Sequence, residues 1–173
     1  LMSFDSGCDL RENGQVDCVH IVFTYFNEIK LNQDIEVYDS GTGRLVALVN
    51  VPYLSSSDDT ILYLYYGNSS CSSQENVIAT WNSDYLMVHH MDGTGNIIDS
   101  TSPAYNGIES GAGSTTAGIM DGCREFDSTL DSYGFGSPSS LNPGTDSCTI
   151  SLWTNVGFVS NHHIVDKYSA RSG

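Results

Sequence analysis

The sequence predicts an all-β protein built as a sandwich or a jelly roll. Short apolar runs recur at even spacing, separated by clusters of Gly, Ser, Asn and Asp, which is the pattern of strands and turns. We find no amphipathic helix of useful length. The most informative run is TILYLYYGN at residues 60–68. Its continuous apolar and aromatic side chains predict a strand buried on both faces, and the Gly-Asn pair predicts the turn that ends it.

The first half of the chain is typical of alternating strands and turns. The DSGTG cluster at 39–43 predicts the turn of a hairpin. Pro52 ends the apolar run at 45–51. Residues 75–79 predict one brief helical turn. The strands expected in this half are residues 19–23, 35–38, 45–51 and 60–66.

A change of amino-acid composition after Trp81 predicts a domain boundary near residue 80. Gly and Ser become more frequent, and loops such as 111–118 appear. The polar stretch 68–76 is typical of a linker or long loop. We therefore expect two units, residues 1–80 and residues 81–173. In the second unit the clearest strands are expected at 85–91, 123–126, 148–153 and 163–168.

The charge of the chain excludes some partners. Its 173 residues carry a formal net charge of −15, from 21 acidic and 6 basic side chains. Such a surface repels phosphate backbones and anionic membranes, so nucleic acid is not an expected partner. No apolar run reaches the ~18 residues of a membrane-spanning helix. Divalent cations and neutral glycans are compatible with this charge.

The five cysteines, at positions 8, 18, 71, 123 and 148, have no C-x-x-C spacing. This excludes cysteine-based zinc sites and thioredoxin-like redox motifs. Cys8 and Cys18 could close a small disulfide loop, which would suit an oxidising compartment. The odd count leaves one thiol free or paired with another chain. The alternative is that most are small buried apolar residues.

Three segments of the first half carry a family resemblance. They are an acidic-ended strand, DIEVY at 34–38, a strand VNVP at 49–52, and the aromatic strand LYYGN at 64–68. Together they resemble the domain of unknown function DUF2341, over roughly residues 5–80. The resemblance implies a β-sandwich domain.

The second half resembles the front part of a laminin-G-like, concanavalin A-like jelly roll. The resemblance implies an incomplete sandwich, whose open edges and apolar face need a cover. We expect this cover to come from residues beyond position 173 or from strands that neighbouring subunits add. Leu1 is not an initiator methionine, so the chain is expected to be a piece of a longer precursor. The matching segments are residues 88–91, 98–101, 124–127, 136–141, 149–153 and 166–169.

One pair of acids invites comparison with jelly-roll glycoside hydrolases. Strand alternation places Glu125 and Asp127 on one face, and retaining hydrolysis needs two carboxylates close together. The third acid of that motif is replaced by Leu130. We therefore expect no enzyme activity, and a glycan-cleaving enzyme is the weakest of three functional hypotheses.

Acidic side chains beside the later strands are the candidate metal ligands. Carboxylate oxygens suit calcium, and laminin-G-like domains often carry one such ion at the sandwich rim. Asp99 and Asp127 are the predicted calcium ligands. The histidine pairs 89–90 and 162–163 cannot chelate from one strand, because neighbouring strand residues point to opposite faces. They are expected to be core or edge residues.

Aromatic residues near loops are the candidate glycan contacts. Stacking on aromatic rings plus hydrogen bonds from Asp and Asn is the usual way of binding sugars. Tyr85, Tyr105 and Tyr133 are the predicted ligand-binding residues, whereas Trp153 is expected in the core. Asn68 begins an N-glycosylation sequon, NSS.

These observations favour a non-catalytic adhesion or recognition protein, extracellular or on a cell surface, that binds a glycan or a surface protein. The alternative is a structural subunit of an extracellular filament, surface layer or virion, a homo-oligomer assembled by strand exchange and an intermolecular disulfide. A glycan array and light scattering distinguish the two.

Overall fold

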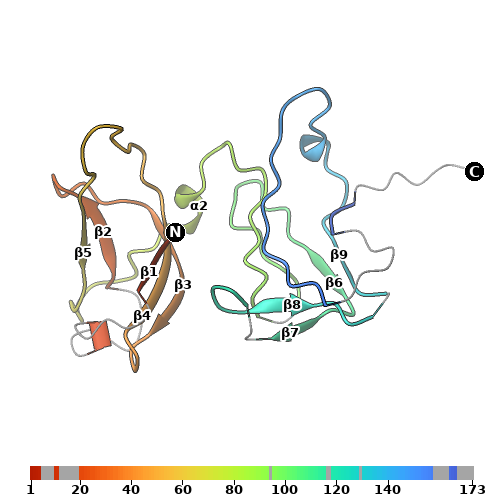
Figure 1. The fold of residues 1–173 in the computed structure, drawn as a ribbon, viewed down its shortest axis with the longest axis horizontal. Coiled ribbons are helices and arrows are strands. Elements are labelled where there is room, and N and C mark those ends of the chain that lie inside the picture. Colours follow the sequence, from red (N-terminus) through yellow and green to blue (C-terminus); the bar gives the residue numbers. More distant parts are fainter. Residues whose placement is uncertain are drawn as a thin grey trace, which may run out of the picture.

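The computed structural model describes residues 1–4, 10–11, 20–93, 95–115, 118–128, 130–157 and 164–166. These residues are nearly all in strands, turns and loops, so the all-β prediction is confirmed. Strands β1 to β5 lie on one side of Figure 1 and β6 to β9 on the other. No described helix is long and apolar enough to span a membrane.

The strands are short in both halves of the chain. The bounds are β1 Met2–Phe4, β2 Val22–Tyr25, β3 Gln33–Asp39, β4 Arg44–Val49, β5 Leu62–Tyr65, β6 Ile108–Ser110, β7 Gly113–Thr115, β8 Cys123–Glu125 and β9 Ser132–Gly134. A helical turn, α2, covers Val77–Thr80, and a 3-10 turn, η1, covers Ser139–Leu141. Asn76 caps α2 by accepting a hydrogen bond from the Ala79 N–H, which agrees with the turn predicted there.

The predicted hairpin is formed by β3 and β4, which pair antiparallel, and β1 adds to β4 to give the order β1-β4-β3. Asp39 holds the turn, because its carboxylate accepts hydrogen bonds from the Gly41 N–H at 2.8 Å and the Thr42 hydroxyl at 2.7 Å. Gly43 takes the left-handed conformation, with φ of 74°, which glycine adopts at little steric cost.

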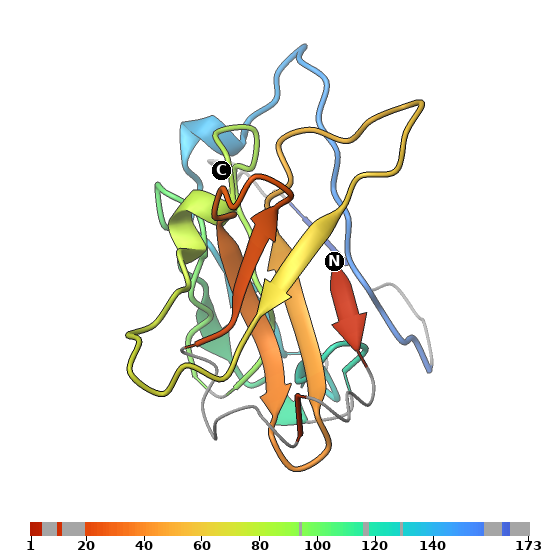
Figure 2. The same ribbon diagram turned by 90° about the vertical axis from the view of Figure 1, so that its left-hand side faces the viewer.

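A second sheet pairs β2 with β5 and lies in front of the first sheet in Figure 2. The buried core between them includes Phe23 from β2 and Leu45 and Ala47 from β4. The side chain of Gln33 joins the sheets: it accepts from the Phe23 N–H at 3.0 Å and donates to the Ile21 carbonyl at 2.5 Å. The first half is therefore a small two-layer sandwich.

The prediction that residues 60–66 are buried on both faces is wrong. Leu62 and Leu64 pack against the core, whereas the alternate side chains, Tyr63 and Tyr65, are 45% and 48% exposed. The physical reason is the position of β5 in a two-stranded sheet. One face covers the core and the other has no layer above it.

The second half holds two separate pairs, β6 with β9 and β7 with β8. Strand β8 confirms the prediction at 123–126. Residues 85–91 form no strand, only an isolated bridge between His89 and Asp99, and residues 148–153 form none either. Of the strand expected at 163–168, residues 164–166 form no strand, and the other three lie outside the described residues.

The expected core position of Trp153 is also wrong, because its side chain is 78% exposed. Its neighbours Ile150 and Leu152 are 66% and 50% exposed. No described strand pairs with this segment, so its apolar side chains find no layer to pack on. Cys123 and Cys148 are free thiols, and Cys8 and Cys18 lie outside the described residues.

Candidate functional site

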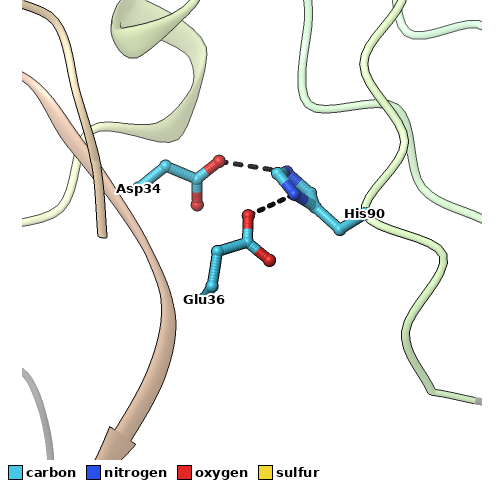
Figure 3. A group of neighbouring side chains, drawn as sticks. All are labelled: Asp34, Glu36 and His90. Carbon is cyan, nitrogen blue, oxygen red and sulfur yellow. Dashed lines mark ion pairs between the residues drawn. The ribbon is translucent and has the colours of Figure 1, made fainter. Parts of the chain in front are cut away.

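Asp34, Glu36 and His90 form a cluster where β3 meets the segment between α2 and β6 (Figure 3). Each side chain offers one ligand-type atom, and these atoms all lie within 4.8 Å of one another. The acids come from the DIEVY strand, and the histidine lies far along the chain. Tertiary folding alone brings the three together.

A β-bulge lies at Glu36 in strand β3. The β3–β4 register shifts between Ile35 and Val37, which leaves Glu36 as the extra residue. Ile35 and Tyr38 both pack against the core, although residues three apart in a regular strand point to opposite faces. The bulge reconciles these positions. Asp34 and Glu36, two residues apart on one face of the strand, both point toward His90 in Figure 3.

The imidazole ring of His90 lies between the two carboxylates. Its Nε2 atom is 3.1 Å from Asp34 Oδ2 and 2.8 Å from the hydroxyl of Ser100. Its Nδ1 atom forms an ion pair with Glu36 Oε1. The side chains of Asp34, Glu36 and His90 are only 10%, 6% and 15% exposed, so the cluster is largely shielded from water.

Trp81 closes one side of the cluster. Its indole N–H donates a hydrogen bond to Asp34 Oδ2 at 3.1 Å, and its ring centroid lies 6.1 Å from that of His90. Tyr85, a predicted ligand contact, packs edge-on against Trp81 with centroids 5.0 Å apart. Tyr85 thus belongs to the surroundings of this cluster and is half exposed.

The cluster holds two acidic side chains and only one basic side chain. Burial lowers the pKa of His90, but the contacts with Asp34 and Glu36 outweigh it and raise the pKa to about 10. The ring is then an imidazolium ion at neutral pH and faces two carboxylates. Oε1 of Glu36 is buried, and no described residue gives it a hydrogen bond of good geometry. Net negative charge held away from water is costly.

Asp99, a predicted calcium ligand, anchors a loop with its carboxylate. Its two oxygens accept hydrogen bonds from the N–H groups of Val88 at 3.0 Å, Thr101 at 3.0 Å and Tyr105 at 2.8 Å. Asp127, the other predicted ligand, is exposed, and its N–H donates to Asp131 Oδ2. The two acids are not part of the metal-type cluster found among the described residues, and calcium binding stays a prediction.

The neighbouring histidine, His89, has different surroundings. Its Nε2 atom lies 2.9 Å from the Tyr105 carbonyl oxygen, and its ring stacks on Phe135 with centroids 4.6 Å apart. Burial lowers the pKa of His89, so this ring is neutral where His90 is charged. The two histidines do not share a site. The pair 162–163 lies outside the described residues.

The three predicted ligand tyrosines have separate neighbours. The Tyr105 hydroxyl lies 2.5 Å from the Ser140 hydroxyl. Tyr133 packs edge-on against Phe126 with centroids 5.8 Å apart, beneath the guanidinium of Arg124. No ring contact joins Tyr85, Tyr105 and Tyr133 in the described part of the chain.

Tyr65 and Tyr66, which sequence reasoning passed over as strand core, line a surface hollow of about 340 Å³. Its lining includes the cross-strand pair Val22 and Tyr65 and residues of the loop that follows β5. The alternation of Tyr63 and Tyr65 with leucines in β5 could have indicated that one face of this strand is exposed. The hollow is lined by His20, Val22, Tyr65, Tyr66, Asn68, Cys71 and Gln74.

Residues 17–102 match the domain of unknown function DUF2341. This match confirms the resemblance noted in the first half. The DUF2341 region contains the whole Asp34, Glu36 and His90 cluster as well as the hollow, and it extends past the boundary predicted near residue 80. No curated protein and no solved structure matches the chain.

Proposed function

We propose that the protein is a non-catalytic recognition module, extracellular or on a cell surface, that binds a neutral glycan in the hollow beside β2 and β5. The single observation that supports this is the lining of the hollow. A half-exposed aromatic ring, Tyr65, shares the lining with the amide side chain of Asn68. Ring stacking with amide hydrogen bonds is the chemistry that recognises sugars.

The loop above the hollow is tied to the sandwich, which favours a preformed site. The Gln74 Oε1 atom accepts a hydrogen bond from the Lys30 ammonium at 2.9 Å. Glu75 accepts one from the Ile35 N–H at 3.0 Å, and the Asn76 N–H donates to the Gln33 carbonyl at 3.0 Å. A binding site that is ordered in advance loses less entropy when the ligand binds.

The charge of the chain favours a neutral ligand. At −15, it repels sulfated or phosphorylated glycans, which carry negative charge. Hydrolysis of the glycan is not expected, since Leu130 stands where the third acid of the glycosidase motif would be. The proposed role is recognition without cleavage.

Replacing Tyr65 by Ala tests the hollow directly. We expect Tyr65→Ala to weaken glycan binding about fivefold, since loss of one aromatic contact is worth about 1 kcal/mol. A glycan array followed by calorimetric titration with the best hit measures this. Tyr63→Ala is the matched control, because Tyr63 is equally exposed on the same face but does not line the hollow. Equal loss in both variants, or no hit on the array, contradicts the proposal.

The second candidate is a structural subunit assembled by strand addition. It is favoured by the exposed apolar segment 148–157, in which Ile150, Leu152, Trp153 and Val156 are each at least half exposed. If the second half is the N-terminal part of a laminin-G-like jelly roll, this segment corresponds to a strand that pairs with a strand of another subunit. Large particles in light scattering support assembly, whereas a monomer that selects glycans supports recognition.

A further inference from the structure

We propose that Asp34, Glu36 and His90 bind a divalent transition-metal ion of the zinc type. This site is separate from the glycan hollow and does not depend on it. The donor set is one imidazole nitrogen and two carboxylate oxygens, a combination that zinc accepts in proteins. Three protein ligands leave a fourth position for water or another group.

The spacing of the donors fits a common ion after small side-chain movements. The three ligand atoms lie within 4.8 Å of one another. Two ligand atoms bound to one tetrahedral zinc ion at about 2.1 Å are roughly 3.4 Å apart. Asp34 Oδ2 and His90 Nε2 are already 3.1 Å apart. Glu36 Oε1 contacts the other ring nitrogen, Nδ1, so the imidazole ring or the Glu36 side chain has to rotate before all three residues bind one ion.

The two carboxylates of the cluster favour the binding of a cation in addition to the imidazole ring. Two carboxylates face a single ring, which leaves net negative charge among side chains that are at least 85% buried, since none exceeds 15% exposure. A divalent ion with a neutral imidazole balances two carboxylates. The buried Oε1 atom of Glu36, which forms an ion pair with His90 Nδ1 but no hydrogen bond of good geometry, is the oxygen that the ion would engage.

The surroundings resemble the outer contacts of metal ligands. Ligating histidines and carboxylates are usually held in orientation by further hydrogen bonds. Trp81 donates a hydrogen bond to Asp34 Oδ2 at 3.1 Å. The Ser100 hydroxyl lies 2.8 Å from His90 Nε2 and orients the ring if Nδ1 is the ligand atom. The bound ion fastens β3 to the segment that carries His90, and so ties together the two halves of the chain.

Metal titration of the whole chain tests the site. After treatment with EDTA, the protein is titrated with zinc chloride by calorimetry, and its melting temperature is recorded with and without zinc. We expect one ion per chain and a raised melting temperature. Glu36→Gln and His90→Gln are expected to weaken zinc binding at least tenfold. His89→Gln is the matched control and keeps the affinity, because His89 bonds to Tyr105 instead.

Cobalt(II) serves as a second probe, because thiols also bind zinc. We expect visible absorption of a nitrogen- and oxygen-ligated ion without thiolate charge-transfer bands, lost in Glu36→Gln and unchanged in Tyr65→Ala. Since this spectrum is recorded on the unmodified chain, it decides the matter even if a variant fails to fold. Thiolate bands, no zinc binding, or equal affinity in His90→Gln and His89→Gln overturns the proposal. Glycan binding can fail without affecting any of these outcomes.

Discussion

At the scale of single residues, Asp99 shows how a buried acid can be structural. Its carboxylate is 5% exposed and accepts three backbone hydrogen bonds from Val88, Thr101 and Tyr105. Burial raises the pKa of Asp99, but these N–H groups outweigh it and lower the pKa below its ordinary value. Sequence reasoning identified Asp99 as important and could not tell a metal ligand from a loop anchor, since both use the same oxygens.

Replacing Asp99 by Asn should destabilise the protein by about 1–3 kcal/mol, because charge-assisted hydrogen bonds are lost. The pKa is lower in the folded state, so the contribution of the carboxylate is complete above its unfolded pKa and disappears as the pH falls through the folded pKa. The difference between Asp99→Asn and the unchanged protein should therefore shrink below about pH 4. Urea unfolding between pH 3 and pH 7 measures it.

Asp127→Asn is the control for this comparison, since Asp127 is exposed. It should leave the free energy of unfolding nearly unchanged at every pH. An equal loss in both variants, or a loss in Asp99→Asn that does not depend on pH, contradicts the role assigned to the Asp99 carboxylate.

At the scale of elements, β3 carries most of the architecture. The sequence placed a strand at 35–38 and its turn at 39–43, because apolar alternation and turn residues are local patterns. It did not reveal the bulge at Glu36, because a bulge depends on the register with the partner strand. The same strand supplies Gln33 to the core and two acids to the metal-type cluster.

Replacing Gln33 by Leu should reduce the free energy of unfolding by about 2–4 kcal/mol. The side chain is fully buried, and its loss leaves the Phe23 N–H and the Ile21 carbonyl without this partner. Each buried unsatisfied group costs about 1–3 kcal/mol. Chemical denaturation measures the change. Gln74→Leu is the control, because Gln74 lies at the surface, and it should cost much less. An unchanged free energy of unfolding in Gln33→Leu would show that the Gln33 side chain does not join the two sheets.

At the scale of the whole molecule, burial is uneven. The described core cluster lies between the two sheets of the first half, whereas the buried apolar residues in the described part of the second half are only Ile97 and Ala112. Contacts between the halves include the His90 cluster and a hydrogen bond from the Arg44 guanidinium to the Met120 carbonyl. The large apolar side chains that are exposed in the described part of the second half are Tyr85, Leu86, Ile98, Ile108, Ile119, Phe126, Leu130, Ile150, Leu152, Trp153, Val156, Ile164 and Val165.

Replacing Trp153 by Ser should change the free energy of unfolding by less than about 0.5 kcal/mol, as for other surface substitutions, because the ring is 78% exposed. Phe23→Ala, which removes a core ring that is 1% exposed, should cost about 3–5 kcal/mol. Urea unfolding at low protein concentration compares the two. A large loss in Trp153→Ser would mean that another layer covers this segment.

The sequence by itself determined the β class, the β3–β4 hairpin and the helical turn before Trp81. Each depends on composition or on residues close together in the chain. Only the tertiary structure decided that one face of β5 is open, that Trp153 is exposed, and that His90 meets Asp34 and Glu36. Those outcomes depend on which strands lie side by side and on what covers them, and local patterns carry no information about pairing across long stretches of chain.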